Sequence, residues 1–261
     1  MAPGREHRHG IATALNGWGQ RAGRWALCAL ALLLSGCVYF SRHTLPGACP
    51  DDLGSPIRNF CVVSPGVLWR SEAPTRSDAR WLVQHGVGSV VSLELDVRHS
   101  FETVRLAPGL SRSVTYYRIK DFSAVQVLTH HHLDQHVALV LAIIAQAPKP
   151  VLVSCRAGVD RTGIIVGAYR MLIDGMSRRR AITEMNGFHS PWDPLNDRYV
   201  RSLSGPRGAR ILRRARQWES SGVKPTGRFE CRAGGCRFVR AGAAVAGARA
   251  TGAASPVTSL W

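Results

Sequence analysis

Residues 151–163 read VLVSCRAGVDRTG, and this stretch decides both the fold class and the chemistry expected of the chain. It runs from a short apolar segment, typical of a buried strand, through a glycine-containing loop into a helical pattern. Backbone N–H groups converge where such a loop enters a helix, so the turn is suited to bind an anion. Cys155 and Arg161 stand at the two ends of this loop, with five residues between them. We therefore expect a phosphate-binding loop with a nucleophile at its base.

Each residue of the loop has an expected part in this site. The helix dipole and the Arg161 cation both favour the thiolate of Cys155, which is its reactive form. The planar guanidinium of Arg161 can bind two phosphate oxygens, and the Thr162 hydroxyl is placed to hydrogen-bond the sulfur. The remaining residues expected to surround the phosphate are Arg156, Ala157, Gly158, Val159 and Asp160. A buried structural cysteine is the alternative, but it would leave Arg161 and Thr162 unexplained.

The stretch resembles the Cys-x5-Arg-Thr-Gly signature of protein tyrosine and dual-specificity phosphatases. Residues 66–75, GVLWRSEAPT, resemble the opening segment of bacterial members, and the resemblance extends over residues 60–190. It implies an α/β cysteine-phosphatase fold, with a central and mainly parallel sheet of about four to five strands flanked by helices. It also implies hydrolysis of phosphate monoesters through a cysteinyl-phosphate intermediate, with no metal or other cofactor. One departure is Ser154, because the family usually carries histidine immediately before the cysteine.

A phosphatase of this kind needs a general acid to protonate the leaving oxygen. By the resemblance, this acid lies on a loop after the strand that precedes the long helix, where the chain has Asp121. A turn cap is the alternative role for Asp121. The other candidates are Glu94, Asp96 and Asp134. The charge of Asp160 would repel phosphate, so we expect its carboxylate to point outward and to orient a neighbour or a substrate hydroxyl.

Apolar patterns predict alternating strands and helices, which favours an α/β fold with a mainly parallel sheet. The predicted strands are 60–63, 67–69, 87–95, 114–119 and 150–154, and the predicted helices are 78–85, 133–145, 162–174 and 178–186. We expect a phosphatase domain over 60–203, preceded by a proline- and glycine-rich linker over 37–59. Residues 204–261 are biased toward Arg, Ala, Gly and Ser, which predicts a largely disordered tail with at most a short helix over 209–218.

The N-terminus has the features of an export signal. Arg21 and Arg24 precede an apolar run too short to span a bilayer comfortably, which predicts a signal peptide over 1–36. The residues 34–37, LSGC, resemble the bacterial lipobox, in which Cys37 would carry the lipid. This implies a lipid anchor on the periplasmic side of a membrane, and Val38 in the next position favours the outer membrane of a Gram-negative cell. An ordinary signal peptide and an uncleaved anchor are the alternatives.

The cysteine count agrees with export. Cys28 falls in the signal, and Cys37 and Cys155 have other expected roles. Four cysteines then remain: Cys49, Cys61, Cys231 and Cys236. An even remainder in an oxidising compartment predicts two disulfides, and we favour the local pairs Cys49–Cys61 and Cys231–Cys236. A zinc site is the alternative, although neither pair has the two-residue spacing of a zinc knuckle.

The formal net charge of +17 is concentrated at the ends of the chain. Residues 201–261 hold 12 Lys and Arg against 2 Asp and Glu, whereas residues 37–200 hold 18 against 14. Because the basic excess lies outside the expected core and no recognition-helix pattern is present, we do not expect nucleic-acid binding. The expected partners are a phosphorylated protein or a small phosphate monoester, and a membrane reached through the lipid anchor.

Two other functions remain open at this point. Relatives that act on inositol phosphates or phosphoinositides tend to have two basic residues in the loop, and this chain has Arg156 but Val159. A non-catalytic, phosphate-binding pseudophosphatase would accommodate Ser154. Histidines at 130–132 and 136 are interpreted as a polar helix N-terminus rather than as a metal site.

Overall fold

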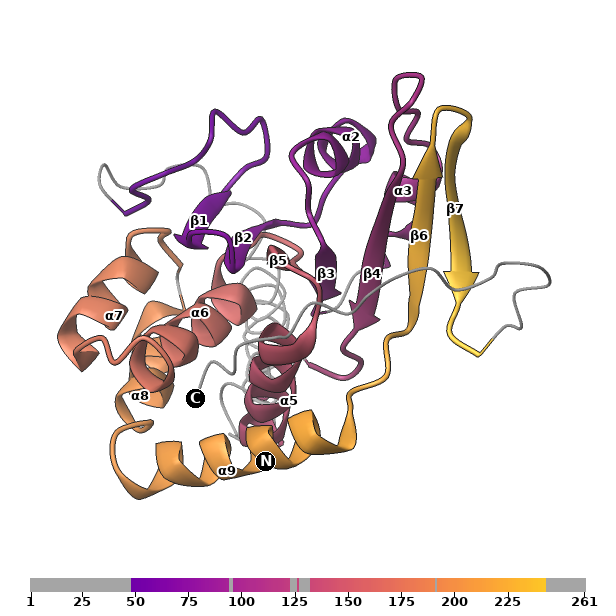
Figure 1. The fold of residues 1–261 in the computed structure, drawn as a ribbon. Coiled ribbons are helices and arrows are strands. Elements are labelled where there is room, and N and C mark those ends of the chain that lie inside the picture. The colour runs from indigo at the N-terminus through magenta and orange to yellow at the C-terminus, as the bar shows by residue number, and fades with distance from the viewer. Residues whose placement is uncertain (1–47, 94–95, 123–125, 127–131, 191, 243–261) are drawn as a thin grey trace, which may run out of the picture. The chain divides into compact units, whose positions relative to one another are not determined.

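The computed structural model describes residues 48–93, 96–122, 126, 132–190 and 192–242. Within these residues one seven-stranded sheet has the order β1-β2-β5-β3-β4-β6-β7 (Figure 1). The strands are β1 (Cys61–Ser64), β2 (Leu68–Glu72), β3 (Ser89–Ser92), β4 (Arg112–Arg118), β5 (Val151–Cys155), β6 (Gly227–Arg232) and β7 (Gly235–Arg240). β2, β5, β3 and β4 are parallel, and β1, β6 and β7 run antiparallel to their neighbours. The expected α/β fold is confirmed, with a larger sheet than predicted.

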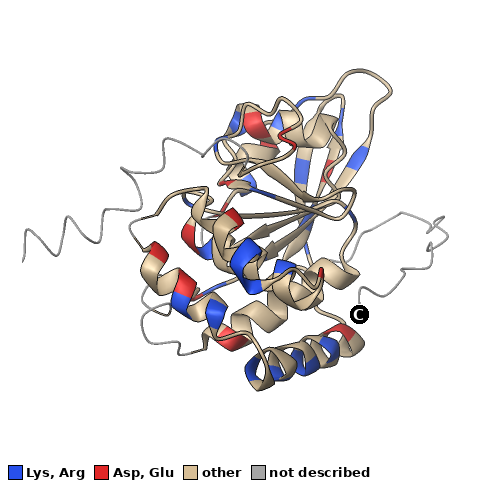
Figure 2. Cartoon of the chain, turned by 90° about the vertical axis from the view of Figure 1, so that its left-hand side faces the viewer, with Lys and Arg blue, Asp and Glu red and all other residues tan. Residues whose placement is uncertain are grey.

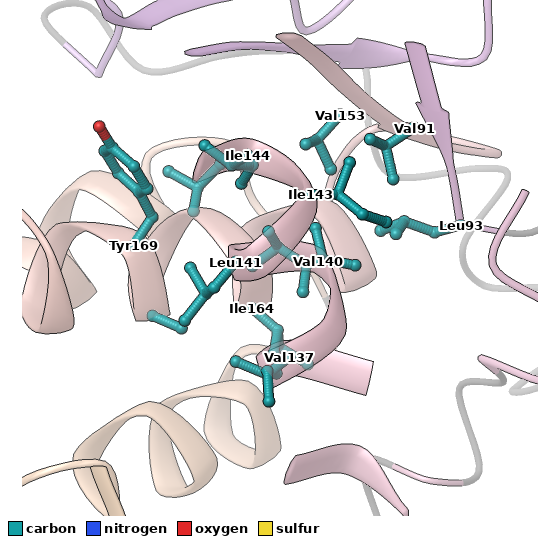
Figure 3. Packing of buried hydrophobic residues seen from close by; sticks show 14 of the residues in the cluster. Val91, Leu93, Val137, Val140, Leu141, Ile143, Ile144, Val153, Ile164 and Tyr169 are labelled. Carbon is teal, nitrogen blue, oxygen red and sulfur yellow. The ribbon is translucent and has the colours of Figure 1, made fainter. Parts of the chain in front are cut away.

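Helices cover both faces of this sheet (Figure 1). They are α2 (Arg76–Gln84), α3 (Arg98–Glu102), α5 (Leu133–Gln146), α6 (Asp160–Leu172), α7 (Arg178–Asn186), α8 (Asp193–Arg201) and α9 (Pro206–Ser221). Val90 and Leu152 belong to the apolar cluster on the side of α2 and α3. The next residue of each strand, Val91 and Val153, belongs to the cluster on the side of α5 and α6 (Figure 3). This alternation is the period of two that places successive strand residues on opposite faces.

Local sequence accounts for the start of α2 and for the end of α5. Thr75 and Asp78 form a capping box that satisfies N–H groups at the start of α2. The Nζ of Lys149 donates to the carbonyls of Ala145 and Ala147, at 3.0 and 2.9 Å, and also to that of Ile144. These bonds satisfy carbonyls that the end of α5 leaves without helical partners. The fully buried β5 follows directly, so the chain enters the central strand from a fixed point.

The prediction of a largely disordered tail is wrong for residues 206–240, which form α9, β6 and β7. Arginines line α9 (Figure 2), but Ile211 and Ala215 lie four residues apart and bury one stripe of the helix in the core. β6 adds to the edge of β4, where Phe229 pairs with Val114. The Arg- and Gly-rich composition concealed this short buried stripe. It also concealed β6, which pairs with the edge of β4. Residues 243–261 lie outside the described residues.

The predicted linker also contributes to the core where it is described. Ile57 and Asn59 are buried, and Ile57 packs in the apolar cluster on the side of α2. No helix in the described ranges is long and apolar enough to cross a membrane. The predicted signal over 1–36 and the lipidation candidate Cys37 lie outside those ranges.

Candidate active site

The loop over 156–159 joins the end of β5 to the start of α6, as the sequence predicted. Cys155 is the last residue of β5 and is only 3% exposed. Among the cysteines of the described residues, it alone is outside a disulfide. β5 lies between the parallel strands β2 and β3, so the loop leaves from the carboxyl ends of the central strands. Ligands bind at this edge in open α/β sheets.

Gly158 allows this loop to turn tightly against the end of β2. Its φ is +70°, and a Cβ there would lie 2.3 Å from the Glu72 nitrogen and 2.4 Å from the carbonyl carbon of Ser71. Its own N–H donates to the Cys155 carbonyl at 3.2 Å. Both the positive φ and the close backbone therefore require glycine at this position.

Arg161 and Thr162 lie in the first turn of α6, and both side chains are buried. Arg161 Nη1 donates to the carbonyl of Phe122 at 3.2 Å, which holds the guanidinium beside the segment that follows β4. Thr162 Oγ1 is buried and has no hydrogen-bond partner among the described residues. Such a hydroxyl is uncommon, because buried polar groups usually find partners. The bond expected from Thr162 to the sulfur stays a prediction.

Asp121 lies three residues after the end of β4 and is exposed, with its φ of 61° in the left-handed region that aspartate tolerates. Its carbonyl accepts a hydrogen bond from Gln126 Nε2. Because Phe122 is the next residue, the contact of Phe122 with Arg161 brings the backbone after Asp121 to the first turn of α6, next to the loop over 156–159. The structure therefore brings Asp121 and Arg161 into the same region, although the two are 40 residues apart in the chain.

The other described carboxylates that the sequence offered as acids are already paired. Asp96 forms ion pairs with Arg98 and Arg118. Burial acts to raise the pKa of Asp96, but the hydrogen bonds and charges of these arginines outweigh it and hold the pKa below the ordinary value. Asp134 accepts two hydrogen bonds from Arg207 Nε at 3.0 Å and one from the Tyr199 hydroxyl. Glu94 lies outside the described residues.

Asp160 orients a neighbouring segment through its buried carboxylate. Its Oδ1 accepts hydrogen bonds from Asn196 Nδ2, at 3.0 Å, and from the Ser190 hydroxyl. Asp193 lies close by, where its Oδ2 accepts from the Ser190 N–H at 3.1 Å. Burial raises the pKa of Asp193 to about 6, although the hydrogen bond from Ser190 acts to lower it. The charge of Asp160 also raises this pKa. Ser190 and Asn196 are thereby tied to the start of α6.

Arg70 is a buried residue beneath the loop that sequence reasoning marked only as part of the family resemblance. Its Nη2 donates to the Gly158 carbonyl at 2.6 Å, and its guanidinium lies 3.5 Å from the ring centre of Phe188. Burial lowers the pKa of Arg70 to about 10, and the negative charge of Cys155 acts against this. Arg70 therefore remains a cation at neutral pH, beneath the nucleophile candidate.

Asn59 is a second buried residue beneath the loop, and no sequence pattern marked it. Its Nδ2 donates to the Ala157 carbonyl at 2.8 Å, across 98 residues of chain. Its φ of 54° is in the left-handed region, which asparagine adopts more readily than most residues. The signal available in the sequence was an asparagine, which tolerates a left-handed backbone, directly before the predicted strand that starts at Phe60.

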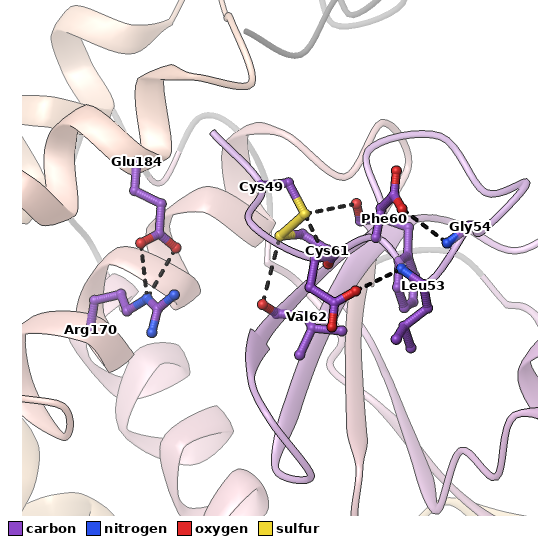
Figure 4. Close-up of a disulfide and its surroundings, with 10 residues drawn as sticks. Cys49, Leu53, Gly54, Phe60, Cys61, Val62, Arg170 and Glu184 are labelled. Atoms are coloured by element: carbon purple, nitrogen blue, oxygen red, sulfur yellow. Dashed lines mark hydrogen bonds and ion pairs between the residues drawn. A yellow bond between two sulfur atoms is a disulfide. The ribbon is translucent and has the colours of Figure 1, made fainter. Parts of the chain in front are cut away.

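The four cysteines left over in the sequence form Cys49–Cys61 and Cys231–Cys236, the two local pairs that were favoured. Cys61 lies in β1 beside Cys49, as Figure 4 shows. Cys231 and Cys236 face each other across β6 and β7. The two bridges therefore lie at opposite ends of the strand order.

The described histidines near the site are His132 and His136, whereas residues 130 and 131 lie outside the described ranges. The His136 ring stacks on Phe122, with 5.2 Å between the ring centres. Burial, together with the charge of His132, lowers the pKa of His136. Within the part of the chain that is described, no three His, Cys, Asp or Glu side chains gather in a way that could hold a metal ion.

An α/β sheet with a Cys-x5-Arg loop at the carboxyl end of its central strand defines the class of cysteine-dependent phosphatases. Residues 62–195, just over half of the chain, match the family described as "DSP-PTPase phosphatase fused to NAD+ Kinase". The chain belongs to this family of dual-specificity-type phosphatases.

Solved structures similar to this chain include phosphatases from bacteria and yeast. TpbA of P. aeruginosa is 27% identical with a TM-score of 0.45, and the match covers 60% of this chain and 91% of that one. A Cys-to-Ser variant of TpbA in complex with phosphotyrosine matches at 25% identity, a TM-score of 0.45, and 63% and 91% coverage. The core catalytic domain of the PP-IP phosphatase SIW14 from S. cerevisiae is 19% identical, with a TM-score of 0.44 and coverage of 62% and 95%.

Proposed function

We propose that this phosphatase hydrolyses phosphate monoesters through a cysteinyl-phosphate intermediate. The Cys155 thiolate attacks phosphorus, the bond from phosphorus to the ester oxygen breaks, and Asp121 gives its proton to the leaving oxygen. Asp121 then accepts a proton from water as the water oxygen attacks phosphorus, which releases phosphate and restores the thiolate. The observation that carries this proposal is the single loop with Cys155 at its base, Arg161 at its far end and the Asp121 segment beside Arg161.

Arg161 and the loop N–H groups supply the electrostatic part of this mechanism. The transferring phosphoryl group carries negative charge on its equatorial oxygens, and Arg161 can bind two of them. The guanidinium is buried in the first turn of α6, so it needs little reorganisation when a phosphate arrives. We infer that Thr162 stabilises the departing sulfur in the second step.

The proposed substrate is a phosphotyrosine or another phosphorylated side chain of a protein. Arg156 is the exposed side chain of the loop and would meet acidic groups around the phosphate. The same exposed cation would suit an inositol phosphate, which is the competing substrate class. A panel of phosphotyrosine and phosphoserine peptides, inositol phosphates and lipid phosphates separates these classes by kcat/KM. A preference for inositol phosphates over every phosphopeptide would overturn the protein-phosphatase assignment.

We also propose that the enzyme acts outside the cytoplasm on a lipid anchor at Cys37. The lipobox-like residues 34–37 and the two disulfides of the folded domain support this, because structural disulfides persist in oxidising compartments. Radiolabelled palmitate should be incorporated into the wild-type chain and not into Cys37→Ser. Equal labelling of both proteins would exclude Cys37 as the lipid site.

The chemical step is tested with two aryl phosphates whose leaving groups differ. Cys155→Ser should lower kcat/KM for p-nitrophenyl phosphate by at least about 10³-fold, because it removes the nucleophile. Asp121→Asn should lower the rate on phenyl phosphate by about 10²-fold or more, and much less on p-nitrophenyl phosphate, whose good leaving group needs little protonation.

The matched control for Asp121 is Asp134→Asn, which changes a carboxylate that is paired with Arg207 and Tyr199. This variant should leave the ratio of the two substrate rates unchanged. A wild-type rate in Cys155→Ser would refute the nucleophile, and an equal loss on both substrates in Asp121→Asn would refute the acid. Loss of activity in a chelator would refute a metal-independent mechanism.

A further inference from the structure

Residues 49–61, closed by the Cys49–Cys61 disulfide, form a segment that we call the brace segment. We propose that the brace segment holds the phosphate-binding loop in its binding shape, and that Asn59 is the positioning residue through which it acts. This inference rests on the proposed function, because it assigns a task to residues that support the proposed phosphate site.

Hydrogen bonds from the brace segment reach the loop and the strand beside it. Asn59 Nδ2 donates to the Ala157 carbonyl at 2.8 Å in a buried position. The Glu72 N–H donates to the Arg58 carbonyl at 3.0 Å, which fixes the end of β2 against which Gly158 is packed. The brace segment thus contacts the loop directly and also contacts the backbone that limits the space around it.

The disulfide packs against the loop on its apolar side. Cys61, Ala157, Val159 and Phe188 form one buried cluster, with Cys49 partly buried against it. Figure 4 shows the bridge at β1, with the Arg170–Glu184 ion pair, whose N–O distance is 3.0 Å, in the same view. The bridge therefore does more than close a surface loop, because its sulfur atoms share a cluster with two loop residues.

Asn59 and Arg70 together hold two successive carbonyls of the loop. Asn59 binds the Ala157 carbonyl and Arg70 binds the Gly158 carbonyl. A trans peptide is planar, so fixing a carbonyl also fixes the direction of the N–H in the same peptide unit, which points the opposite way. Because Arg70 binds the Gly158 carbonyl, the Val159 N–H of the same peptide unit points away from Arg70. The peptide unit that Asn59 holds carries the Gly158 N–H, which donates to the Cys155 carbonyl, so the Asn59 bond fixes the turn of the loop. With that turn fixed, an N–H directed like that of Val159 is what an anion site needs.

Cys61 connects the disulfide to Asn59 and Arg70, the two side chains that donate to the loop carbonyls. Cys61 pairs with Arg70 across β1 and β2, and Asn59 lies two residues before Cys61. Without the bridge, the chain before β1 would be free to leave the cluster, and Asn59 would lose the constraint that holds its left-handed backbone. We therefore expect loss of the bridge and loss of the Asn59 amide to weaken phosphate binding in the same way.

The test uses four full-length variants. Asn59→Gly removes the amide and tolerates the φ of 54°, and Asn59→Asp keeps the shape but cannot donate to the Ala157 carbonyl. The pair Cys49→Ser and Cys61→Ser removes the brace disulfide. The matched control is the pair Cys231→Ser and Cys236→Ser, which removes the bridge at the other end of the strand order. All are assayed well below their melting temperatures.

We expect both Asn59 variants and the brace-disulfide variant to raise KM for p-nitrophenyl phosphate and Ki for inorganic phosphate. Each rise should be about tenfold, because the loss of one buried hydrogen bond has an effect of this size. The control variant should melt at a lower temperature but keep KM and Ki within twofold of wild type. Unchanged KM and Ki in the Asn59 variants, or equal rises in the two disulfide variants, would overturn the proposal.

Phosphate binding separates this proposal from the proposed function. The same variants are combined with Cys155→Ser and titrated with inorganic phosphate by calorimetry, which requires no turnover. If wild type shows no Cys155-dependent turnover but the Asn59 variants still bind phosphate tenfold more weakly, the mechanism fails and the positioning role stands. If turnover is normal and phosphate affinity does not change in these variants, the positioning role fails alone.

Discussion

The backbone of β2 limits which residues can occupy the loop over 156–159. Gly158 turns at a positive φ with Glu72 and Ser71 in direct contact, so the loop has no space for a side chain at that point. Its carbonyl is held by Arg70, a cation with no exposed surface. The shape of the loop therefore depends on β2 as much as on its own sequence, because the same strand supplies both the contact and the donor.

Gly158→Ala should destabilise the fold by about 1–3 kcal/mol through backbone strain, and lower kcat/KM as the loop moves away from β2. Urea unfolding and turnover of p-nitrophenyl phosphate measure the two effects. The matched control is Gly175→Ala, where φ is +66° but no atom lies within 4 Å of the added Cβ. Equal losses of stability in the two variants, with activity kept in both, would show that the contact with β2 does not limit the loop.

At the scale of elements, α9 shows how a basic segment becomes part of the core. Arg210, Arg213, Arg214 and Arg216 are exposed, and Arg207 is partly buried in its ion pair with Asp134 of α5. Ile211 and Ala215 are buried in the cluster that also contains residues of α5 and α6. The side chain of Gln146, the last residue of α5, donates to the Val223 carbonyl at 2.9 Å just beyond α9. α9 is therefore tied to the domain at its buried stripe and at its C-terminal end.

Ile211→Ala should lower the free energy of unfolding by about 2–5 kcal/mol, because it leaves a cavity in this cluster. Arg213→Ala changes an exposed position of the same helix and should stay within about 0.5 kcal/mol of wild type. Denaturant unfolding of both variants makes the comparison. Wild-type stability in Ile211→Ala would mean that α9 is not packed on the domain.

For the whole molecule, two partly buried carboxylates make stability depend on pH in opposite directions. The pKa of Asp193 is raised from 3.8 to about 6, mainly by burial, so the folded state binds its proton more tightly than the unfolded chain does. Its contribution to stability is complete below about pH 4 and is lost as the pH rises through about 6. The pKa of Asp96 is lowered through its arginine partners, so its contribution is lost as the pH falls.

Asp193→Asn should remove the fall in stability between about pH 4 and 6, because the amide does not titrate but can still accept from the Ser190 N–H. Above about pH 6 the variant should be more stable than wild type. Thermal melts at several pH values measure this, with Asp52→Asn at an exposed position as the control. If the melting temperature of Asp193→Asn changes with pH as that of wild type does, the pH dependence of stability comes from other groups.

Much of the fold was predictable because its signals are local. The buried strand before Cys155, the helix after it and the capping residue Thr75 each act within a few residues of chain. α8 was missed because it is short and polar. α9 was predicted only as at most a short helix over 209–218, and β6 and β7 were missed because composition concealed their pattern. β6 in particular pairs with β7, its neighbour in the chain, and also with the edge of β4, which is distant in sequence.

The sequence by itself determined the loop, its nucleophile candidate Cys155 and its phosphate-binding candidate Arg161, because these residues are contiguous and their geometry follows from one strand–loop–helix turn. Only the tertiary structure decided what holds that loop. Asn59 and Arg70 are 98 and 88 residues from the carbonyls they bind, and no short-range pattern can encode such pairs. Buried donors are selected by the unpaired carbonyls they must satisfy, and those exist only once the chain has folded.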